Sequence, residues 1–442
     1  MSKKKENTGI NISVKSFITA IVVIFVLMVL TYGLTFLIPG GGISFWKWAL
    51  SPILVLGAEG NVSLMAVIAF LLVIGGIFNC LDKCGLMQYM LDTITDKFGK
   101  ERYKLLALIT LFFMLMGSMI GSFEEAVPMV PIVVALAVRL GWNPLVGLGM
   151  SILAIGCGFS AGVCNPFTVG VAQELAGLPM FSGIWFRLLT FVLVYTLLLA
   201  FLYIYAKKVK RPIDTEDIKS SFCYDAKMDK GLKLFAGIMC AGILLVLSSV
   251  VITFLQDITM IIVAVTFLVA GLVAVNATGR GGNIRKTFLN GVTNVFPAVF
   301  MILMANSIKY IMIEGNILNP ILQGMLDTAA KLPGWSVILF IYIIVLGLNF
   351  FIPSGSAKAF LLMPLIIPIA ETFGISSQLC IVAYAFGDGF SNVLYPTNPV
   401  LLISLGLADV DYGKWLKWSW KFQFLNFILT SLLLLFSLFL HY

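Results

Sequence analysis

Charged side chains interrupt otherwise apolar stretches at three places in this 442-residue chain. Glu124 and Glu125 break one apolar run, Lys358 breaks a second, and Asp388 lies in the apolar segment after it. Ionisable groups are costly inside a membrane and usually serve a function there. A buried carboxylate can carry a proton, bind a cation or pair with an ammonium group. We therefore expect these four residues to belong to a functional site.

Hydroxyl, amide and glycine residues accompany the charges at the same breaks. Hydroxyl and carbonyl oxygens suit a hard cation such as Na⁺, and an amide can bind either a cation or an anion. Helix N-termini at the breaks favour a carboxylate. The candidates for substrate or ion binding are Ser122, Glu124, Glu125, Asn165, Thr168, Ser354, Gly355, Ser356, Lys358, Asp388, Ser391, Asn392, Thr397 and Asn398. The predicted Na⁺ positions are near Ser122, Asn165, Ser354 and Asn398.

The breaks occur twice, and a constant shift in residue number relates them. Adding 233 brings one set of landmarks onto the other: Gly141 onto Gly374, Pro131 onto Pro364, and Asn165-Pro166 onto Asn398-Pro399. The same shift places Glu125 on Lys358. Paired interruptions in two halves of a membrane protein indicate a transporter built from repeats, with its binding site at the interruptions.

Composition identifies the class of protein that must position these residues. The chain is 60% hydrophobic and 11% charged, whereas soluble domains are about 45–50% apolar. The net charge of +8 comes from cations clustered in short loops, as the positive-inside rule requires. We therefore expect a multi-pass protein of the cytoplasmic (inner) membrane with the lipid bilayer as a partner, and no nucleic-acid partner.

The predicted fold is an all-α polytopic membrane protein with two inverted repeats, each holding a re-entrant hairpin and a broken transmembrane helix. The first hairpin is inferred because its arms, 105–120 and 128–138, are shorter than the ~20 residues of a full crossing. About nine crossings and two hairpins result. The predicted parts are a cytoplasmic N-terminus at 1–16, a first repeat at 17–206 with hairpin 103–140 and broken helix 145–178, a cytoplasmic linker at 207–233, and an extra crossing with the second repeat at 234–440, including hairpin 335–373 and broken helix 376–407.

Four motifs resemble a known family. They are FEE at the first hairpin tip, NPFTVGVAQELAGLPMFSG, NFFIPSGS and FGDGFSNVLYPTNP. They are similar to those of the YfcC family, in the C4-dicarboxylate anaerobic carrier group of the ion transporter superfamily. The resemblance implies a homodimer whose mobile transport domain works as an elevator. In related transporters Ser-Asn-Thr motifs at the hairpin tips hold sodium and the substrate carboxylate, whereas the tips here read GSFEE and PSGS.

The favoured function is secondary active transport of a small carboxylate, either a dicarboxylate or an amino acid, coupled to Na⁺ or H⁺. The alternative is an amino-acid exchanger of the arginine/ornithine type that no coupling ion drives. A channel would need a continuous polar pore. An intramembrane enzyme would need a nucleophile–base pair, for which the sequence offers only Ser356 and Lys358. We therefore expect no enzymatic activity and no cofactor beyond a possible coupling Na⁺.

Two structural alternatives remain for the same residues. The hydroxyl and amide groups can serve only to satisfy the broken helix backbone. Glu125 and Lys358 can form an ion pair that holds the two hairpins together. We favour a coupling-ion role for Glu125, because two Glu and one Asp against one Lys suit a cation or a substrate amino group.

Overall fold

The structure is a computed structural model that describes residues 14–58, 62–98, 101–121, 123–179, 181–211, 224–248, 259–329, 331–440 and 442. Within these ranges every regular element is a helix. Seven of these described helices are long and apolar enough to cross a membrane, judged by length and composition. The prediction of an all-helical, multi-pass membrane protein is therefore confirmed.

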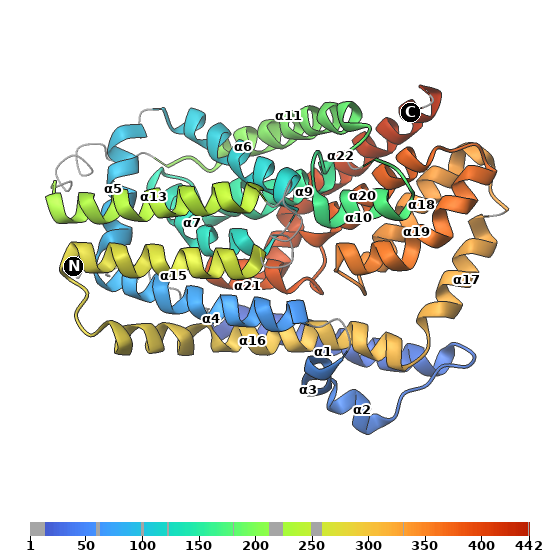
Figure 1. Cartoon of the computed structure of the whole chain (residues 1–442), viewed down its shortest axis with the longest axis horizontal. Coiled ribbons are helices and arrows are strands. Elements are labelled where there is room, and N and C mark those ends of the chain that lie inside the picture. The colour runs from blue at the N-terminus through green and yellow to red at the C-terminus, as the bar shows by residue number, and fades with distance from the viewer. Residues whose placement is uncertain are drawn as a thin grey trace.

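One group of helices runs along the long axis of the molecule (Figure 1). It consists of α1 (Val14–Leu37), α4 (Val62–Lys83), α13 (Ala226–Ser248), α15 (Thr259–Thr278) and α16 (Ile284–Glu314). α16 packs against α1 and α4, and α15 packs against α4 and α13. Small residues allow the α4–α16 backbones to approach closely: a Cβ placed on Gly291 would lie 2.2 Å from the carbonyl oxygen of Gly75.

A second group surrounds the two breaks. Its long members are α6 (Arg102–Ile120), α11 (Ile184–Lys208), α18 (Gly334–Asn349), α19 (Gly355–Thr372), α20 (Ser377–Asn392) and α22 (Tyr412–Phe439). Its shorter members are η3 (Glu124–Met129), α7 (Val130–Arg139), α8 (Pro144–Leu148), η4 (Gly149–Leu153), α9 (Ala154–Ala161), η5 (Pro166–Gly170), α10 (Val171–Leu175) and α21 (Pro399–Leu407). α6 packs against α9, α18 packs against α20, and α9 packs against α20. The core of this group is thus formed by the broken helices of both halves.

Helix order repeats along the chain with the shift of 233 residues. Adding 233 to the bounds of α5 (Leu86–Phe98) gives 319–331, and α17 spans Leu318–Ala329. Both helices cross the long axis, and they lie at opposite ends of the molecule (Figure 1). α5 follows α4 after a bend of 76° at Gly85, whose φ of 82° suits a residue without a side chain. The two halves share one order of helices, and their inversion across a membrane stays a prediction.

The boundary after the predicted linker differs from expectation. α13 begins at Ala226, inside the predicted linker 207–233. The reason is local: Asp225 Oδ1 accepts hydrogen bonds from the backbone N–H groups of Lys227 (2.9 Å) and Met228 (3.3 Å), which caps the helix. A search for apolar runs misses this polar first turn. Residues 212–223 of the linker lie outside the described ranges.

The number of spans also differs from the expected nine. Judged by length and composition, the seven candidate spans include two helices that were predicted as hairpin arms, Arg102–Met119 and Gly355–Thr372. Helices α20 and α21 were predicted to form one broken crossing. Each of them is too short to count as a candidate span. The predicted extra crossing ends at 255, and its last residues, 249–255, lie outside the described ranges. Length alone cannot distinguish a hairpin arm from a crossing.

Candidate functional site

The distal half of each broken helix contacts the hairpin of the other half of the chain. α10 follows the first break and packs against α19, the second arm of hairpin 335–373. α21 follows the second break and packs against α7 and η3 of hairpin 103–140. Figure 1 shows α9 near the centre of the long axis, with α10 and α20 between it and α18 and α19. The fold therefore brings residues 233 positions apart into one central region.

A fully buried ion pair occupies this region. Lys358 Nζ lies 2.7 Å from Asp388 Oδ1, and both side chains are 0% exposed. The ammonium also donates to the backbone carbonyl of Ile352 at 3.1 Å and to Oδ1 of Asn349. A lysine ammonium has three protons, and each has an oxygen acceptor here. Its charge and its hydrogen-bonding capacity are therefore both satisfied.

Asn349 connects the ion pair to the second break. Its Nδ2 lies 2.9 Å from the carbonyl oxygen of Asp388, 2.6 Å from Ser391 Oγ and 3.0 Å from Asn392 Oδ1. Asn392 Oδ1 also accepts from Asn398 Nδ2 at 3.1 Å. Asn398 Oδ1 in turn accepts from the Val400 N–H at 2.9 Å, which caps α21. One network therefore joins the ion pair to the helix that begins after the break.

The first break is held by the tip of its own hairpin. The backbone N–H of Val163 donates to Oγ of Ser118 at 3.0 Å. The backbone N–H of Cys164 donates to the carbonyl oxygen of Ser118 at 3.1 Å. Gly121 has a φ of +74°, and a Cβ there would lie 1.9 Å from Asn165 Oδ1. Asn165 Oδ1 accepts from the N–H of Thr168 at 3.1 Å. Asn165 thus organises the break in the way that Asn398 does in the second half.

The two halves meet at Gly355, the first residue of α19. A Cβ placed there would lie 2.4 Å from Thr168 Cγ2 and 2.6 Å from Asp388 Oδ2. Both Thr168 Oγ1 and Asp388 Oδ2 are buried and have no hydrogen-bond partner within the described part of the chain. Unsatisfied buried oxygens are costly, and a carboxylate oxygen especially so. The Asp388 Oδ2 carboxylate oxygen is suited to a cation or to an ammonium group of a ligand.

The remaining candidates are placed differently. Ser354 is the N-cap residue of α19 without a side-chain cap bond, and Ser356 is half-buried in its first turn. Thr397 is buried and its Oγ1 has no partner among the described residues. Ser122 lies outside the described ranges, as do the side chains of Glu124 and Glu125. Their predicted roles, and the Na⁺ position near Ser122, stay predictions.

Lys358 forms an ion pair with Asp388, whereas the side chain of Glu125 lies outside the described ranges, so the pair of Glu125 with Lys358 stays a prediction. The shift of 233 relates positions in the two halves, but it does not say which side chains touch. α19 packs against α18 and α20 of its own half. Because a helical side chain leans toward the helix N-terminus, Lys358 reaches the end of α18 and the middle of α20.

Three side chains that organise the candidate site were not singled out from the sequence. Asn349 was visible only as the first letter of the NFFIPSGS motif. Tyr384 donates its hydroxyl to the carbonyl of Gly355 and so fixes the start of α19. Arg187 is 1% exposed and donates to the carbonyls of Ser182 at 2.8 Å and Val163 at 3.4 Å. A single cation at the start of an apolar run gives no indication that it binds the carbonyls of a distant break.

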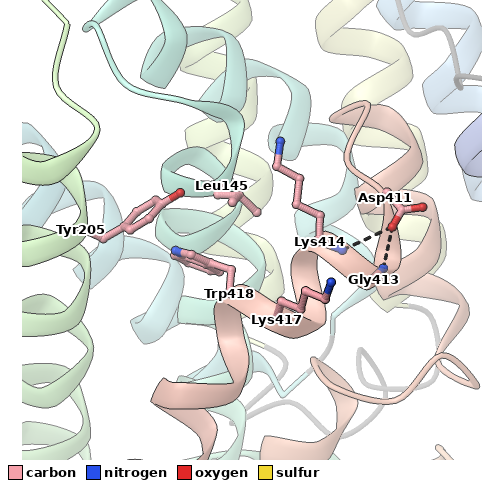
Figure 2. A pocket seen from close by; sticks show the side chains of 7 residues that line it. All are labelled: Leu145, Tyr205, Asp411, Gly413, Lys414, Lys417 and Trp418. Atoms are coloured by element: carbon pink, nitrogen blue, oxygen red, sulfur yellow. Dashed lines mark hydrogen bonds between the residues drawn. The ribbon is translucent and has the colours of Figure 1, made fainter.

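A surface pocket of about 580 Å³ lies apart from these residues, between α8, α11 and the start of α22 (Figure 2). It is lined by Leu145, Tyr205, Asp411, Gly413, Lys414, Lys417 and Trp418. Asp411 Oδ1 accepts from the backbone N–H groups of Gly413 (2.8 Å) and Lys414 (3.3 Å), which caps α22. None of the candidate residues lines this pocket, and its carboxylate already has a structural role.

Two broken helices that cross at a buried charge within a helical membrane bundle are typical of secondary transporters. The chain belongs to the C4-dicarboxylate anaerobic carrier (DcuC) family, whose family model matches residues 49–438. It is 29% identical over 391 residues to a protein of Escherichia coli (strain K12) provisionally named basic amino acid antiporter YfcC. This alignment covers 84% of this chain and 77% of that protein. An uncharacterised protein of Haemophilus influenzae is 27% identical over 375 residues, covering 81% and 72%. The family resemblance of the four motifs is thus confirmed.

Solved structures of transporters align along nearly the whole chain. The YdaH transporter of Alcanivorax borkumensis aligns with a TM-score of 0.49 and 16% identity, over 96% of this chain and 99% of that one. MtrF of Neisseria gonorrhoeae, described with a class of antimetabolite efflux pumps, aligns with a TM-score of 0.44 and 14% identity, over 94% of both chains.

Proposed function

We propose that the protein is a secondary active transporter that moves a small carboxylate across the cytoplasmic membrane by an elevator mechanism, driven by Na⁺ or H⁺. The observation that carries this proposal is the meeting of both halves at Gly355, between the Thr168 methyl group and Asp388 Oδ2, an oxygen that is buried without a protein partner in the described ranges. A site shared by two broken helices can be exposed to one side of the membrane at a time.

The carboxylate end of the substrate fits the N-terminus of α19. This 18-residue helix begins at Gly355, and its N-cap Ser354 makes no side-chain cap bond. The N–H groups of its first turn and the helix dipole favour an anion. Because Asp388 neutralises Lys358, the ion pair provides no net charge for a second carboxylate. An amino acid, with its ammonium group toward Asp388 Oδ2, therefore fits better than a dicarboxylate.

The elevator mechanism is supported by the division of helices into two groups. α1, α4, α13, α15 and α16 form the proposed scaffold, through which a homodimer would assemble. The helices around the two breaks form the proposed moving unit. The inverted arrangement is supported by α5 and α17, which lie at opposite ends of the molecule (Figure 1). The cationic residues Lys3 to Lys5 support a cytoplasmic N-terminus.

Uptake into proteoliposomes tests this proposal. A thermal-shift panel of amino acids and organic acids first selects a ligand, because binding to the folded state raises the apparent stability. We expect saturable accumulation of that ligand against its gradient when a Na⁺ or H⁺ gradient is imposed. Uptake that only equalises the concentrations, without saturation, would indicate a channel and contradict the proposal.

A second candidate is exchange of basic amino acids without a coupling ion. It is favoured by the unpartnered Asp388 Oδ2, which suits an ammonium or guanidinium group, and by the name of the E. coli relative. In this case uptake of labelled arginine or ornithine should require unlabelled amino acid inside the vesicle. Dissipating the ion gradients should then leave the exchange rate unchanged.

A further inference from the structure

The surroundings of Lys358 Nζ have the composition of a monovalent-cation site. Its three oxygen neighbours are a carboxylate oxygen of Asp388 at 2.7 Å, the backbone carbonyl oxygen of Ile352 at 3.1 Å and the amide oxygen of Asn349. Carboxylate, amide and backbone oxygens are the ligands that hard cations prefer. In transporters with broken helices, unwound carbonyls and helix C-termini commonly coordinate the coupling cation.

The backbone geometry supports this interpretation. α18 ends at Asn349, and Ile352 lies in the non-helical link before α19 begins at Gly355. The Ile352 carbonyl is therefore free of the regular pattern of helix bonds and can accept from Nζ. Three separate features of the chain thus direct oxygens at one buried point: a helix end, an unwound link and the carboxylate of α20.

We infer that the Lys358 ammonium occupies a cation site and takes the place of a coupling sodium ion. A lysine ammonium is a compact point charge with the same charge as Na⁺, and its four-carbon stem delivers it to the site from α19. With Lys358 in place, the site needs no Na⁺ from solution. The consequence for transport, that no Na⁺ is needed at this site, rests on the proposed function. The inference that the Lys358 ammonium occupies a cation site does not.

The opposing explanation is an ordinary ion pair that only ties α19 to α20. Both explanations predict that loss of Lys358 destabilises the protein. They differ in ion selectivity: a vacated cation site should bind Na⁺, whereas an unpaired Asp388 outside such a site should respond to all monovalent salts alike.

The test is a thermal unfolding measurement on the purified full-length protein in detergent. Lys358→Ala removes the ammonium and leaves space among the three oxygens. We expect sodium chloride, compared with choline chloride at equal ionic strength, to raise the melting temperature of this variant saturably by about 2–4 °C. The wild-type protein should show no difference between the two salts.

Two control variants complete the experiment. Lys358→Met fills the same volume with an apolar chain and should show no sodium response. Lys47→Ala removes the lysine of a surface ion pair with Glu314, whose side chains are 56% and 33% exposed, and should also show none. An equal response of Lys358→Ala to both salts would overturn the inference.

If Lys358→Ala does not fold, uptake by the wild-type protein still tests the inference. Because the inference narrows the driving ion of the proposed function to H⁺, wild-type uptake in proteoliposomes should be unchanged when choline replaces sodium on both sides of the membrane. Sodium-dependent uptake together with sodium-specific stabilisation of the wild type would overturn the inference. Where Lys358→Ala does fold and shows the expected sodium response, absence of any uptake would count against the proposed function and leave the cation site supported.

Discussion

At the scale of single residues, the structure changes which charges must be considered together. Lys358 pairs with Asp388 inside its own half of the chain, and both are completely buried. Removing one member of a buried pair typically costs about 3–5 kcal/mol, whereas replacing both members by apolar residues can be neutral. This asymmetry separates the structural contribution of the pair from its part in transport.

We predict that Lys358→Met alone lowers the free energy of unfolding by about 3–5 kcal/mol, because the Asp388 carboxylate loses its partner. Combining it with Asp388→Leu should restore most of the stability. The double variant should nevertheless fail to transport, because the oxygen proposed to bind the ligand has been removed. Thermal unfolding and uptake measured on the same preparations check both parts, and transport by a stable double variant would show that the pair is only structural.

For the paired asparagines Asn165 and Asn398 we predict ligand binding in addition to their hydrogen bonds within the breaks, and substitutions can separate the two roles. Asn398→Ala and Asn165→Ala should each reduce ligand affinity roughly ten- to a hundredfold, since loss of a hydrogen bond to a charged group costs about 1.5–3 kcal/mol. Asn398 also caps α21, and serine is an equally good N-cap residue. Asn398→Ser should therefore keep the stability and still lose affinity. Full ligand affinity in Asn398→Ser would show that Asn398 only caps α21 and does not bind the ligand.

At the scale of elements, the sequence predicted the positions of the breaks better than their contacts. Gly, Pro and Asn mark interruptions through local backbone preference, so the predicted arm 105–120 agrees closely with α6, Arg102–Ile120. The contacts depend on tertiary packing. The network through Asn349 requires the end of α18 to lie against α20, and no local pattern encodes that. The π-helical segments η4 and η5 were not predicted either, because no local pattern encodes them.

The start of α19 provides a prediction with a matched control. Gly355→Ala should impair transport strongly, because its Cβ would lie 2.4 Å from Thr168 Cγ2 and 2.6 Å from Asp388 Oδ2. Gly347→Ala, in the neighbouring helix α18, meets nothing within 4 Å and should leave transport unchanged. Ligand-induced thermal shift and uptake distinguish the two variants. Wild-type behaviour of Gly355→Ala would show that the two halves do not meet there during transport.

At the scale of the whole molecule, each half of the chain contacts the hairpin of the other half. α10 of the first half packs on α19 of the second, and α21 of the second half packs on α7 of the first. We therefore expect each broken helix to move together with the hairpin of the other half. This reciprocal packing suits a rigid moving unit, as an elevator mechanism requires, and it places the shared site near the centre of that unit.

The opposite placement of α5 and α17 (Figure 1) leads to a prediction about topology. Gln88 on α5 and Gln323 on α17 are both exposed, so a cysteine at either position should react with a membrane-impermeant maleimide. In a background without native cysteines, Gln323→Cys should be labelled on intact cells, and Gln88→Cys only after the membrane is opened. An inverted repeat requires this difference, because equivalent helices of the two halves must face opposite sides of the membrane. Labelling of both positions on intact cells, or of neither, would contradict the inverted arrangement and with it the proposed exposure of the site to alternate sides.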